Sequence, residues 1–344
     1  MKRAALHNLG CKVNAYETQA MQEMLEEHGY EIVPFEEKAD IYIVNTCTVT
    51  NMADRKSRQM IHRARKRNRE AVVAAAGCYV QAKREGADPD IDIIIGNNLK
   101  KDIIAILAEY EESRREARGR GRVQMEVTDI SHEKEYEDLS LTRTADHTRA
   151  YIKVQDGCNQ FCTYCIIPKV RGSFRSVPMD VLVKEASELA EGGVKELILV
   201  AQETTVYGKD LYGEKSLPRL LRELCRIPGI EWIRLLYCYP EEITDDLIET
   251  IKTEPKICHY LDMPIQHASD RILRQMGRRT NQAELRERIG RLREEIPDIC
   301  LRTTLISGFP GECQEDHEEL YNFVDELEFD RLGIFTYSQE EGTA

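Results

Sequence analysis

The sequence of 344 residues lacks any long hydrophobic run. No stretch approaches the roughly 20 apolar residues that a membrane-spanning helix needs, and the opening residues, MKRAALHNLGCKVN, hold no apolar core of a signal peptide. These absences predict a cytoplasmic protein without a membrane partner. Positive charge is also scarce, because 48 Lys and Arg residues stand against 61 Asp and Glu residues, for a net charge of −13. That balance argues against a uniformly basic nucleic-acid-binding protein, although it allows a local basic patch.

The chain has 11 cysteines, an odd number, and no export signal. In the reducing compartment that this predicts, a disulfide framework is rare. Ligation of a metal or an iron–sulfur cluster is therefore the leading interpretation. Apolar residues make up 42% and charged residues 32% of the sequence, which indicates a globular protein. The length favours about two domains.

The first hundred residues alternate short apolar runs with helical patterns. The predicted strands are residues 4–9, 40–45, 72–76 and 91–95, and a helical pattern covers 17–29. Strands that alternate with helices predict a parallel sheet with helices on both faces. Residues 1–100 are therefore predicted to form a flavodoxin-like α/β domain. Residues 101–145 are predicted to be a charged connector. It begins as a helical pattern with Ile103, Ile104, Leu107 and Ala108, and it then loses its apolar periodicity through EESRREARGRGR.

The second half, residues 146–344, repeats a strand–helix unit. Its predicted strands are residues 151–155, 196–201, 232–237, 257–262, 300–306 and 332–337, and its clearest helical patterns are 180–190, 245–252 and 282–295. Six such units, rather than eight, predict a partial (β/α)6 TIM-like barrel.

Cys158, Cys162 and Cys165 stand in one segment, DGCNQFCTYC, which is the sharpest motif of the chain. Three thiolates this close can hold three irons of a [4Fe–4S] cluster. The next cysteine is Cys225, so the fourth iron is predicted to keep an open position, as catalytic metal sites do. A zinc site and three unrelated thiols are the alternatives, and His147 would be a poor fourth zinc ligand. The predicted loop at the mouth of a barrel favours the cluster.

Cys11, Cys47 and Cys78 lie far apart, but each follows a predicted strand and precedes a helical pattern. The carboxyl ends of parallel strands meet at one edge of a sheet, so the three cysteines are expected to converge there. Three buried structural cysteines are the alternative. A second [4Fe–4S] cluster, again with one open iron, is the preferred interpretation because all three cysteines share the same structural position.

These motifs resemble those of the methylthiotransferase family of radical S-adenosylmethionine enzymes, and the similarity covers nearly the whole chain. The spacing C-x3-C-x2-C is similar to that of the radical superfamily, and the two cysteine trios in this order are specific to the family. The resemblance implies two [4Fe–4S] clusters and S-adenosylmethionine as cofactors, with a reductant such as flavodoxin or ferredoxin. It also implies catalytic roles for all six cysteines: the later trio makes the radical, and the earlier trio carries the sulfur. The implied reaction replaces an unactivated C–H bond by C–SCH3.

Four further residues are expected at the cofactor. Gln202 ends the second barrel strand and is expected to bond the methionyl amine, and Arg302 on the fifth strand is expected to pair with the carboxylate. Gln266 ends the fourth strand and is expected to face the ribose. Gly308 stands in ISGFPGE, which resembles the cofactor-contacting turn of the superfamily. Ordinary hydrogen bonding at a barrel mouth, or a plain strand–helix turn at Gly308, is the alternative.

Finer resemblances disagree about the substrate. Residues 1–167, with LGCKVNAYET and NTCTVTNMADRKSRQ, look like the tRNA methylthiotransferase that acts on threonylcarbamoyladenosine next to the anticodon. Residues from about 170 onward, with LVAQETTVYGKDLYG and YLDMPIQHASDRIL, look like the enzyme that modifies an aspartate of a small-subunit ribosomal protein. We predict a tRNA substrate, with the ribosomal protein as the alternative and a hybrid chain as one explanation. The family's C-terminal all-β TRAM domain is expected to be absent, because the sequence stops about where the barrel ends.

One strongly basic run, residues 55–69, carries eight Lys and Arg residues and no acid. A solvated helix face is the ordinary interpretation, and contact with RNA phosphates is the other. The same two interpretations apply to the connector arginines, Arg114, Arg115, Arg118, Arg120 and Arg122.

Two other classes of function compete with the enzyme. A two-cluster electron carrier would need closed clusters, which two trios without a fourth ligand do not favour. A zinc-dependent RNA-binding module without catalysis would be colourless after anaerobic purification.

Overall fold

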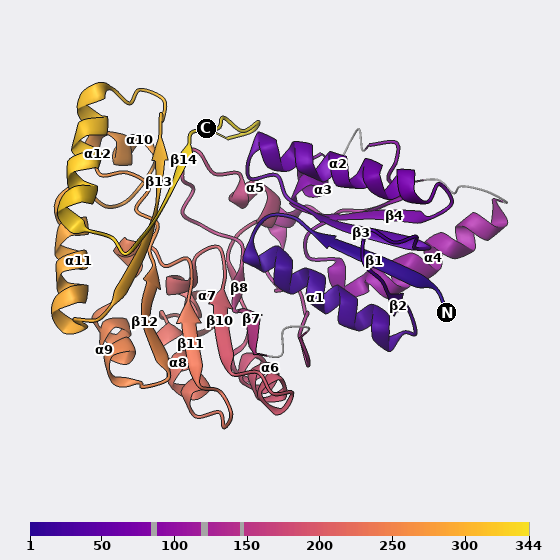
Figure 1. The fold of residues 1–344 in the computed structure, drawn as a ribbon, viewed down its shortest axis with the longest axis horizontal. Coiled ribbons are helices and arrows are strands. Elements are labelled where there is room, and N and C mark those ends of the chain that lie inside the picture. Colours follow the sequence, from indigo (N-terminus) through magenta and orange to yellow (C-terminus); the bar gives the residue numbers. More distant parts are fainter. Residues whose placement is uncertain (84–87, 118–122, 145–147, 344) are drawn as a thin grey trace. The chain divides into compact units, whose positions relative to one another are not determined.

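The computed structural model describes residues 1–83, 88–117, 123–144 and 148–343, and it divides into two units (Figure 1). The first unit comprises Met1–Arg143 and Ile166–Ser173, and the second comprises Thr144–Cys165 and Phe174–Ala344. His147, Arg118, Arg120 and Arg122, which were weighed above, lie outside the described residues. Each unit is built on a parallel six-stranded sheet, which confirms the predicted α/β class.

The sheet of the first unit has the order β2-β1-β3-β4-β5-β6. Its first five strands follow the flavodoxin-like order, as predicted. The strands are β1 (Arg3–Asn8), β2 (Glu31–Ile32), β3 (Ile41–Thr46), β4 (Val72–Gly77), β5 (Ile93–Ile95) and β6 (Gln124–Glu126). Every residue of β3 and β4 is buried, because helices cover both faces of the sheet.

Helices α1 and α4 cover one face of this sheet, and α2 covers the other (Figure 1). The helices of this unit are α1 (Lys12–Glu27), α2 (Asn51–Arg67), α3 (Cys78–Ala82), α4 (Ile103–Glu116) and α5 (Ile167–Arg171), with short 3-10 turns η1 (Lys100–Asp102) and η2 (Ile130–His132). Helix α1 begins five residues before the predicted start at residue 17, and its first turns already hold the buried side chains Val13 and Tyr16. The stretch predicted to be a connector contributes α4 and β6 to this unit.

The sheet of the second unit has the order β14-β13-β12-β11-β10-β7, with all neighbours parallel. Six strands in sequence order agree with the predicted partial barrel. The strands are β7 (Arg149–Lys153), β10 (Glu196–Val200), β11 (Trp232–Leu235), β12 (Ile257–Asp262), β13 (Cys300–Ser307) and β14 (Arg331–Thr336), and a short antiparallel pair joins β8 (Gln155–Asp156) to β9 (Arg175–Ser176).

Helices connect successive strands of the second unit on its outer side (Figure 1). They are α6 (Met179–Glu191), α7 (Lys209–Tyr212), α8 (Leu217–Cys225), α9 (Asp245–Thr253), α10 (Asp270–Gln275), α11 (Gln282–Glu295) and α12 (Gln314–Leu327), with 3-10 turns η3 (Thr204–Val206) and η4 (Pro240–Glu242). Helix α11 has the predicted bounds because a capping box between Asn281 and Glu284 fixes its start. Among the described residues, no helix has both the length and the apolar content to cross a membrane.

Candidate functional site

Cys11, Cys47 and Cys78, which we call the first trio, lie at one edge of the sheet of the first unit. Cys11 precedes α1 directly, Cys47 follows β3, and Cys78 is the first residue of α3 after β4. Strands β1, β3 and β4 are adjacent and parallel, so their carboxyl ends share an edge. The structure therefore brings together the three cysteines that the sequence separates by more than thirty residues each.

Two glycines fit the backbone tightly around this trio. Gly10 has φ +93°, and a Cβ atom there would stand 2.6 Å from the Cys47 sulfur. Gly77 also has φ +93°, and its Cβ atom would stand 2.5 Å from Oδ1 of Asn45. Both positions need glycine for conformation and for space. The space is taken by the side chain of Asn45, on β3, and by that of Cys47, in the loop after β3.

Buried polar groups surround the first trio. The Arg171 Nε donates to the Cys78 sulfur at 3.3 Å, and Nδ2 of Asn97 lies 3.6 Å from the same sulfur. Sequence patterns missed both residues, since Arg171 is far from Cys78 in sequence and Asn97 belongs to a turn. Burial raises the pKa of the Cys11 thiol, and it raises the pKa of Cys47 to about 12. A metal bound by these thiols would have to displace their protons.

Cys158, Cys162 and Cys165, which we call the second trio, lie in the loop that follows β8. Cys158 and Cys162 are buried and Cys165 is half-buried. Burial raises the pKa of the Cys158 thiol to about 12. A hydrogen bond from the Gln160 backbone lowers this pKa, and the neighbouring Glu203 carboxyl raises it further. Burial also raises the pKa of Glu203 to about 8, which favours the neutral form of this carboxyl beside the trio.

An aromatic and cationic wall stands beside the second trio. The Tyr239 hydroxyl lies 3.5 Å from the Cys162 sulfur, and the Arg278 guanidinium lies 4.2 Å from the centre of the Tyr239 ring. Arg278 is buried and bonds Glu241 at 3.1 Å. Its Nε and Nη1 have no hydrogen-bond partner within the described part of the chain. A cationic group with free donors suits an anionic neighbour at this point.

The sulfur spacing separates a cluster from a single metal ion. Within the described ranges, neither trio has all three sulfur atoms within 4.8 Å of one another; the group that meets this criterion is His62, Asp88 and Asp90. A tetrahedral zinc ion with bonds of about 2.3 Å would draw its sulfurs to within about 4 Å. A cubane spreads its ligands further apart, because each sulfur binds a different iron. Neither trio, as it stands in the described part of the chain, therefore has the sulfur spacing of a zinc site.

Two of the predicted cofactor residues present unpaired polar atoms. Both side-chain polar atoms of Gln202 and Oε1 of Gln266 are buried without a hydrogen-bond partner among the described residues. Gln266, after β12, has φ +70°, and Tyr237, after β11, has φ +60°. Left-handed backbone at residues other than glycine is typical of functional sites. These observations fit a polar ligand at the carboxyl ends of the barrel strands.

The other two predicted cofactor residues are engaged by protein groups. Nη1 of Arg302 lies 2.5 Å from Oδ1 of Asp262, near the start of β13 rather than at its carboxyl end. Gly308, directly after β13, has φ +78° and donates its N–H to Glu312 at 2.6 Å. Glu312 also accepts from Phe309 at 2.9 Å, so it holds the turn in shape.

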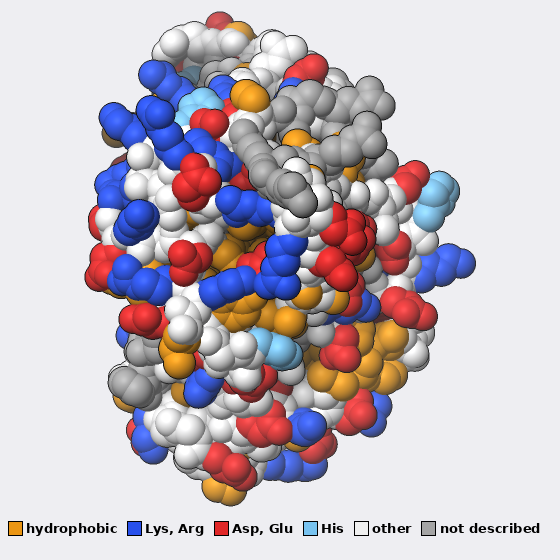
Figure 2. Space-filling model, turned by 90° about the vertical axis from the view of Figure 1, so that its right-hand side faces the viewer, with side chains coloured by type: hydrophobic (Ala, Val, Ile, Leu, Met, Phe, Trp, Pro, Cys, Tyr) orange, Lys and Arg blue, Asp and Glu red, His pale blue; other side chains and the backbone are white. Residues whose placement is uncertain are grey.

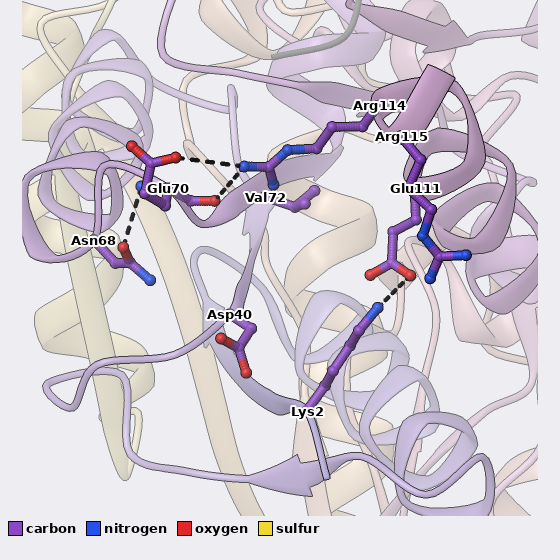
Figure 3. A pocket seen from close by; sticks show the side chains of 8 residues that line it. All are labelled: Lys2, Asp40, Asn68, Glu70, Val72, Glu111, Arg114 and Arg115. Carbon is purple, nitrogen blue, oxygen red and sulfur yellow. Dashed lines mark hydrogen bonds and ion pairs between the residues drawn. The ribbon is translucent and has the colours of Figure 1, made fainter. Parts of the chain in front are cut away.

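A cavity of about 510 Å³ lies at the opposite edge of the first sheet (Figure 3). It is lined by residues at the amino ends of β1, β3 and β4 and by α4: Lys2, Asp40, Asn68, Glu70, Val72, Glu111, Arg114 and Arg115. Lys2 pairs with Glu111, and Arg114 pairs with Glu70. On the face in Figure 2, Lys and Arg side chains are likewise interspersed with Asp and Glu. This mixed charge, at the sheet edge opposite the first trio, does not mark the reaction site.

Family models match both halves of the chain. The model described as "Uncharacterized protein family UPF0004" matches residues 3–96, and that of the radical SAM superfamily matches residues 152–324. A ribosomal protein uS12 methylthiotransferase RimO from Lachnoclostridium phytofermentans is 47% identical over 342 residues, which cover 98% of this chain and 76% of the relative. The chain belongs to the methylthiotransferase family of radical S-adenosylmethionine enzymes. A second family member with the same name, from Geobacter sulfurreducens, is 44% identical and covers 99% of this chain and 76% of its own length.

Solved structures agree with the family in fold. The radical S-adenosylmethionine methyltransferase TsrM from Kitasatospora setae, with cobalamin and a [4Fe–4S] cluster bound, has a TM-score of 0.67 at 17% identity, covering 98% of this chain and 72% of its own. The cobalamin-dependent radical enzyme OxsB has a TM-score of 0.61 at 10% identity, covering 94% and 52%. At these identities the likeness concerns the fold alone.

Family membership confirms several predictions and corrects one. The chain is a transferase that uses S-adenosylmethionine and [4Fe–4S] clusters, which decides against an electron carrier and a zinc-dependent RNA-binding module. The predicted tRNA substrate is not supported by these relatives. The relatives named for a ribosomal protein match 98% or more of the chain, and so they also match residues 1–167, which had been the basis of the tRNA prediction. The same coverage leaves no need for a hybrid chain.

Proposed function

We propose that the chain methylthiolates an aspartate of the ribosomal protein uS12, replacing a C–H bond by C–SCH3. The single observation that carries this proposal is the identity of 47% with a uS12 methylthiotransferase across 98% of the chain. A ribosomal substrate would keep the reaction in the cytoplasm. The reaction would consume two S-adenosylmethionine molecules, one as methyl donor and one as radical source, together with a sulfur equivalent and electrons from a reductant such as flavodoxin or ferredoxin.

We infer that each trio holds one cluster. A [4Fe–4S] cluster with an open iron supplies, when bound, the electron that splits the sulfonium of S-adenosylmethionine. The second trio is our candidate for that role, because it lies beside the carboxyl ends of barrel strands. Tyr239 lies against Cys162 and Arg278 lies over the Tyr239 ring, and we propose that the two limit the access of water to this cysteine. The first trio is our candidate for holding the sulfur that is inserted.

Four residues are proposed to contact the cofactor, two of them through polar atoms that have no partner in the described part of the chain. Gln202 is proposed to accept from the methionyl amine, and Gln266 to bond the ribose hydroxyls, since both side chains have buried atoms without partners in the described part of the chain. Arg302 is proposed to direct its remaining N–H groups to the methionyl carboxylate, while Asp262 holds it in place. Gly308 is proposed to let the turn after β13 approach the cofactor.

An anaerobic assay of the reconstituted chain tests the substrate. Purified uS12, intact small ribosomal subunits and bulk tRNA are each incubated with S-adenosylmethionine, sulfide and reductant. Mass spectrometry then searches for a gain of CH2S. We expect the gain on an aspartate of uS12. A gain on threonylcarbamoyladenosine of tRNA, with uS12 unchanged, would contradict the proposal.

The cluster ligands are tested in the same preparation. Cys162→Ala and Cys47→Ala are each expected to lose about half of the iron, whereas Cys225→Ala, on α8 in the second unit, is expected to keep all of it. Full iron in Cys47→Ala would remove the first trio from the proposal.

A further inference from the structure

The segment Ile166–Ser173 belongs to the first unit, although it directly follows Cys165 of the second trio. Within it, Ile166 and Val170 pack against Cys78 in a small buried cluster. The turn of α5 then ends at Arg171, whose side chain is fully buried. Arg171 therefore follows the last cysteine of the second trio by six residues in the sequence, and its side chain contacts Cys78 of the first trio.

Arg171 is fixed by several strong contacts. Its Nη1 lies 2.5 Å from Oε1 of Glu17, and its Nη2 lies 3.1 Å from Oε2 of Glu17 and 2.5 Å from Oδ1 of Asn14. A bidentate pair of this kind fixes the plane of a guanidinium. Because the plane is fixed, the third nitrogen, Nε, is held at 3.3 Å from the Cys78 sulfur.

Buried ion pairs within the described part of the chain link Arg171 to a second cation, Lys100. Lys100 is also fully buried and lies 3.3 Å from Glu17 and 3.8 Å from Glu137. Among these described ion pairs, two buried cations face two buried carboxylates. Lys100 also bonds Oδ1 of Asn97, whose Nδ2 lies 3.6 Å from the Cys78 sulfur. Both N–H donors that reach this sulfur are anchored in the same network.

We propose that Arg171 is a positioning residue that, together with Asn97, donates to the Cys78 sulfur and raises the reduction potential of the cluster in the first trio. The inference rests on the proposed ligation by Cys11, Cys47 and Cys78. Reduction adds negative charge to a cluster and its sulfurs, and N–H donors stabilise that charge. Neither residue touches the substrate in this proposal.

The test uses full-length chain with Cys162→Ala, so that the cluster in the first trio is read alone. Arg171→Lys keeps the charge opposite Glu17, but a lysine cannot span Glu17 and the sulfur as a guanidinium does. Arg171→Gln combined with Glu17→Gln removes one cation and one anion, so the buried charge stays balanced. Each variant is reduced stepwise without oxygen, and its cluster is followed by electron paramagnetic resonance. Iron content and circular dichroism are recorded for each.

At the midpoint potential of the parent, we expect both variants to show an approximately tenfold lower ratio of reduced to oxidised cluster. For a one-electron couple this corresponds to a midpoint potential that is lower by about 59 mV. Arg234→Lys is the matched control, since Arg234 pairs with Glu196 at 2.7 Å in the second unit, and it should keep the parental ratio. A variant that folds but has lost its cluster would also support the role of Arg171 in holding Cys78. Parental ratios and iron in both Arg171 variants would overturn the inference. A Cys162→Ala parent without any cluster would instead overturn the ligation by the first trio, and with it this inference.

Discussion

The first trio is assembled from three strand ends, whereas the second trio is contained in one loop. Cys11, Cys47 and Cys78 meet only because β1, β3 and β4 are adjacent and in register. Cys158, Cys162 and Cys165 are neighbours in the sequence before the chain folds. The first trio therefore depends on the whole sheet, and the second depends mainly on its own loop and the wall beside it.

The two trios also differ in the number of buried charged groups that lie beside them. The first is backed by a network of fully buried ions, Glu17, Lys100, Glu137 and Arg171. The second has a single buried ion pair beside it, between Arg278 and Glu241, with Arg278 lying over the ring of Tyr239. Buried ion networks fail sharply when one member is removed, so mutations that act through the fold should affect the first trio more strongly.

The largest expected effect separates the roles of the trios. Cys162→Ala should reduce the formation of 5′-deoxyadenosine to background, because the second trio is proposed to bind the radical source. Cys47→Ala should keep that formation but give no methylthio product. Quantification of both products by mass spectrometry after one anaerobic incubation checks this. Product formation by Cys47→Ala at the unmodified rate would show that the two trios do not divide the work.

The next effect probes the ion network. Glu17→Gln removes the carboxylate that Arg171 and Lys100 share, and breaking a buried pair on one side costs about 3–5 kcal/mol. The loss should appear in denaturant unfolding of the first unit and in its iron content. Glu188→Gln, which removes an exposed partner of Lys184, is the control and should change stability by less than about 1 kcal/mol. Equal stability of the two variants would mean that the network does not brace the first trio.

The sequence predicted the trios better than their supports. Spacing alone identified Cys158, Cys162 and Cys165, and the strand–Cys–helix pattern was sufficient to place Cys11, Cys47 and Cys78 at one edge. Arg171, Asn97 and Tyr239 were missed, because each reaches its cysteine across a tertiary contact that leaves no local pattern. Strand β6 was missed for a related reason: Gln124–Glu126 has no apolar alternation and exists through pairing with β5.

A smaller effect concerns the glycine beside Cys47. Gly10→Ala combines a left-handed backbone with a Cβ atom 2.6 Å from the Cys47 sulfur, and we expect it to cost about 2–4 kcal/mol and to lower the iron of the first trio. Gly29→Ala is matched to it, because Gly29 has φ +80° but nothing within 4 Å of the added atom. It should cost about 1 kcal/mol and leave iron unchanged. Equal iron in the two variants would show that contact with Cys47 is not what requires Gly10.

The smallest effect compares two helix caps of the same geometry, one in each unit. The Thr50 side chain accepts from Ala53 N–H at 3.2 Å at the start of α2, and the Thr244 side chain accepts from Leu247 N–H at 3.2 Å at the start of α9. Replacing either threonine by alanine should lower stability by about 1 kcal/mol.

Of the two substitutions, only Thr50→Ala is expected to affect iron retention in a cysteine trio. Ser57, in the second turn of α2, accepts from the Cys47 N–H at 3.2 Å and donates to the Cys47 carbonyl at 2.9 Å. We therefore expect a loosened start of α2 to loosen the backbone of this cysteine. If the whole of that 1 kcal/mol were transmitted, Thr50→Ala would weaken iron retention in the first trio by up to about fivefold. Iron release to a chelator, measured side by side for Thr50→Ala and Thr244→Ala, checks this. Equal release rates would mean that α2 does not transmit strain to Cys47, and the first trio would then depend on its sheet alone.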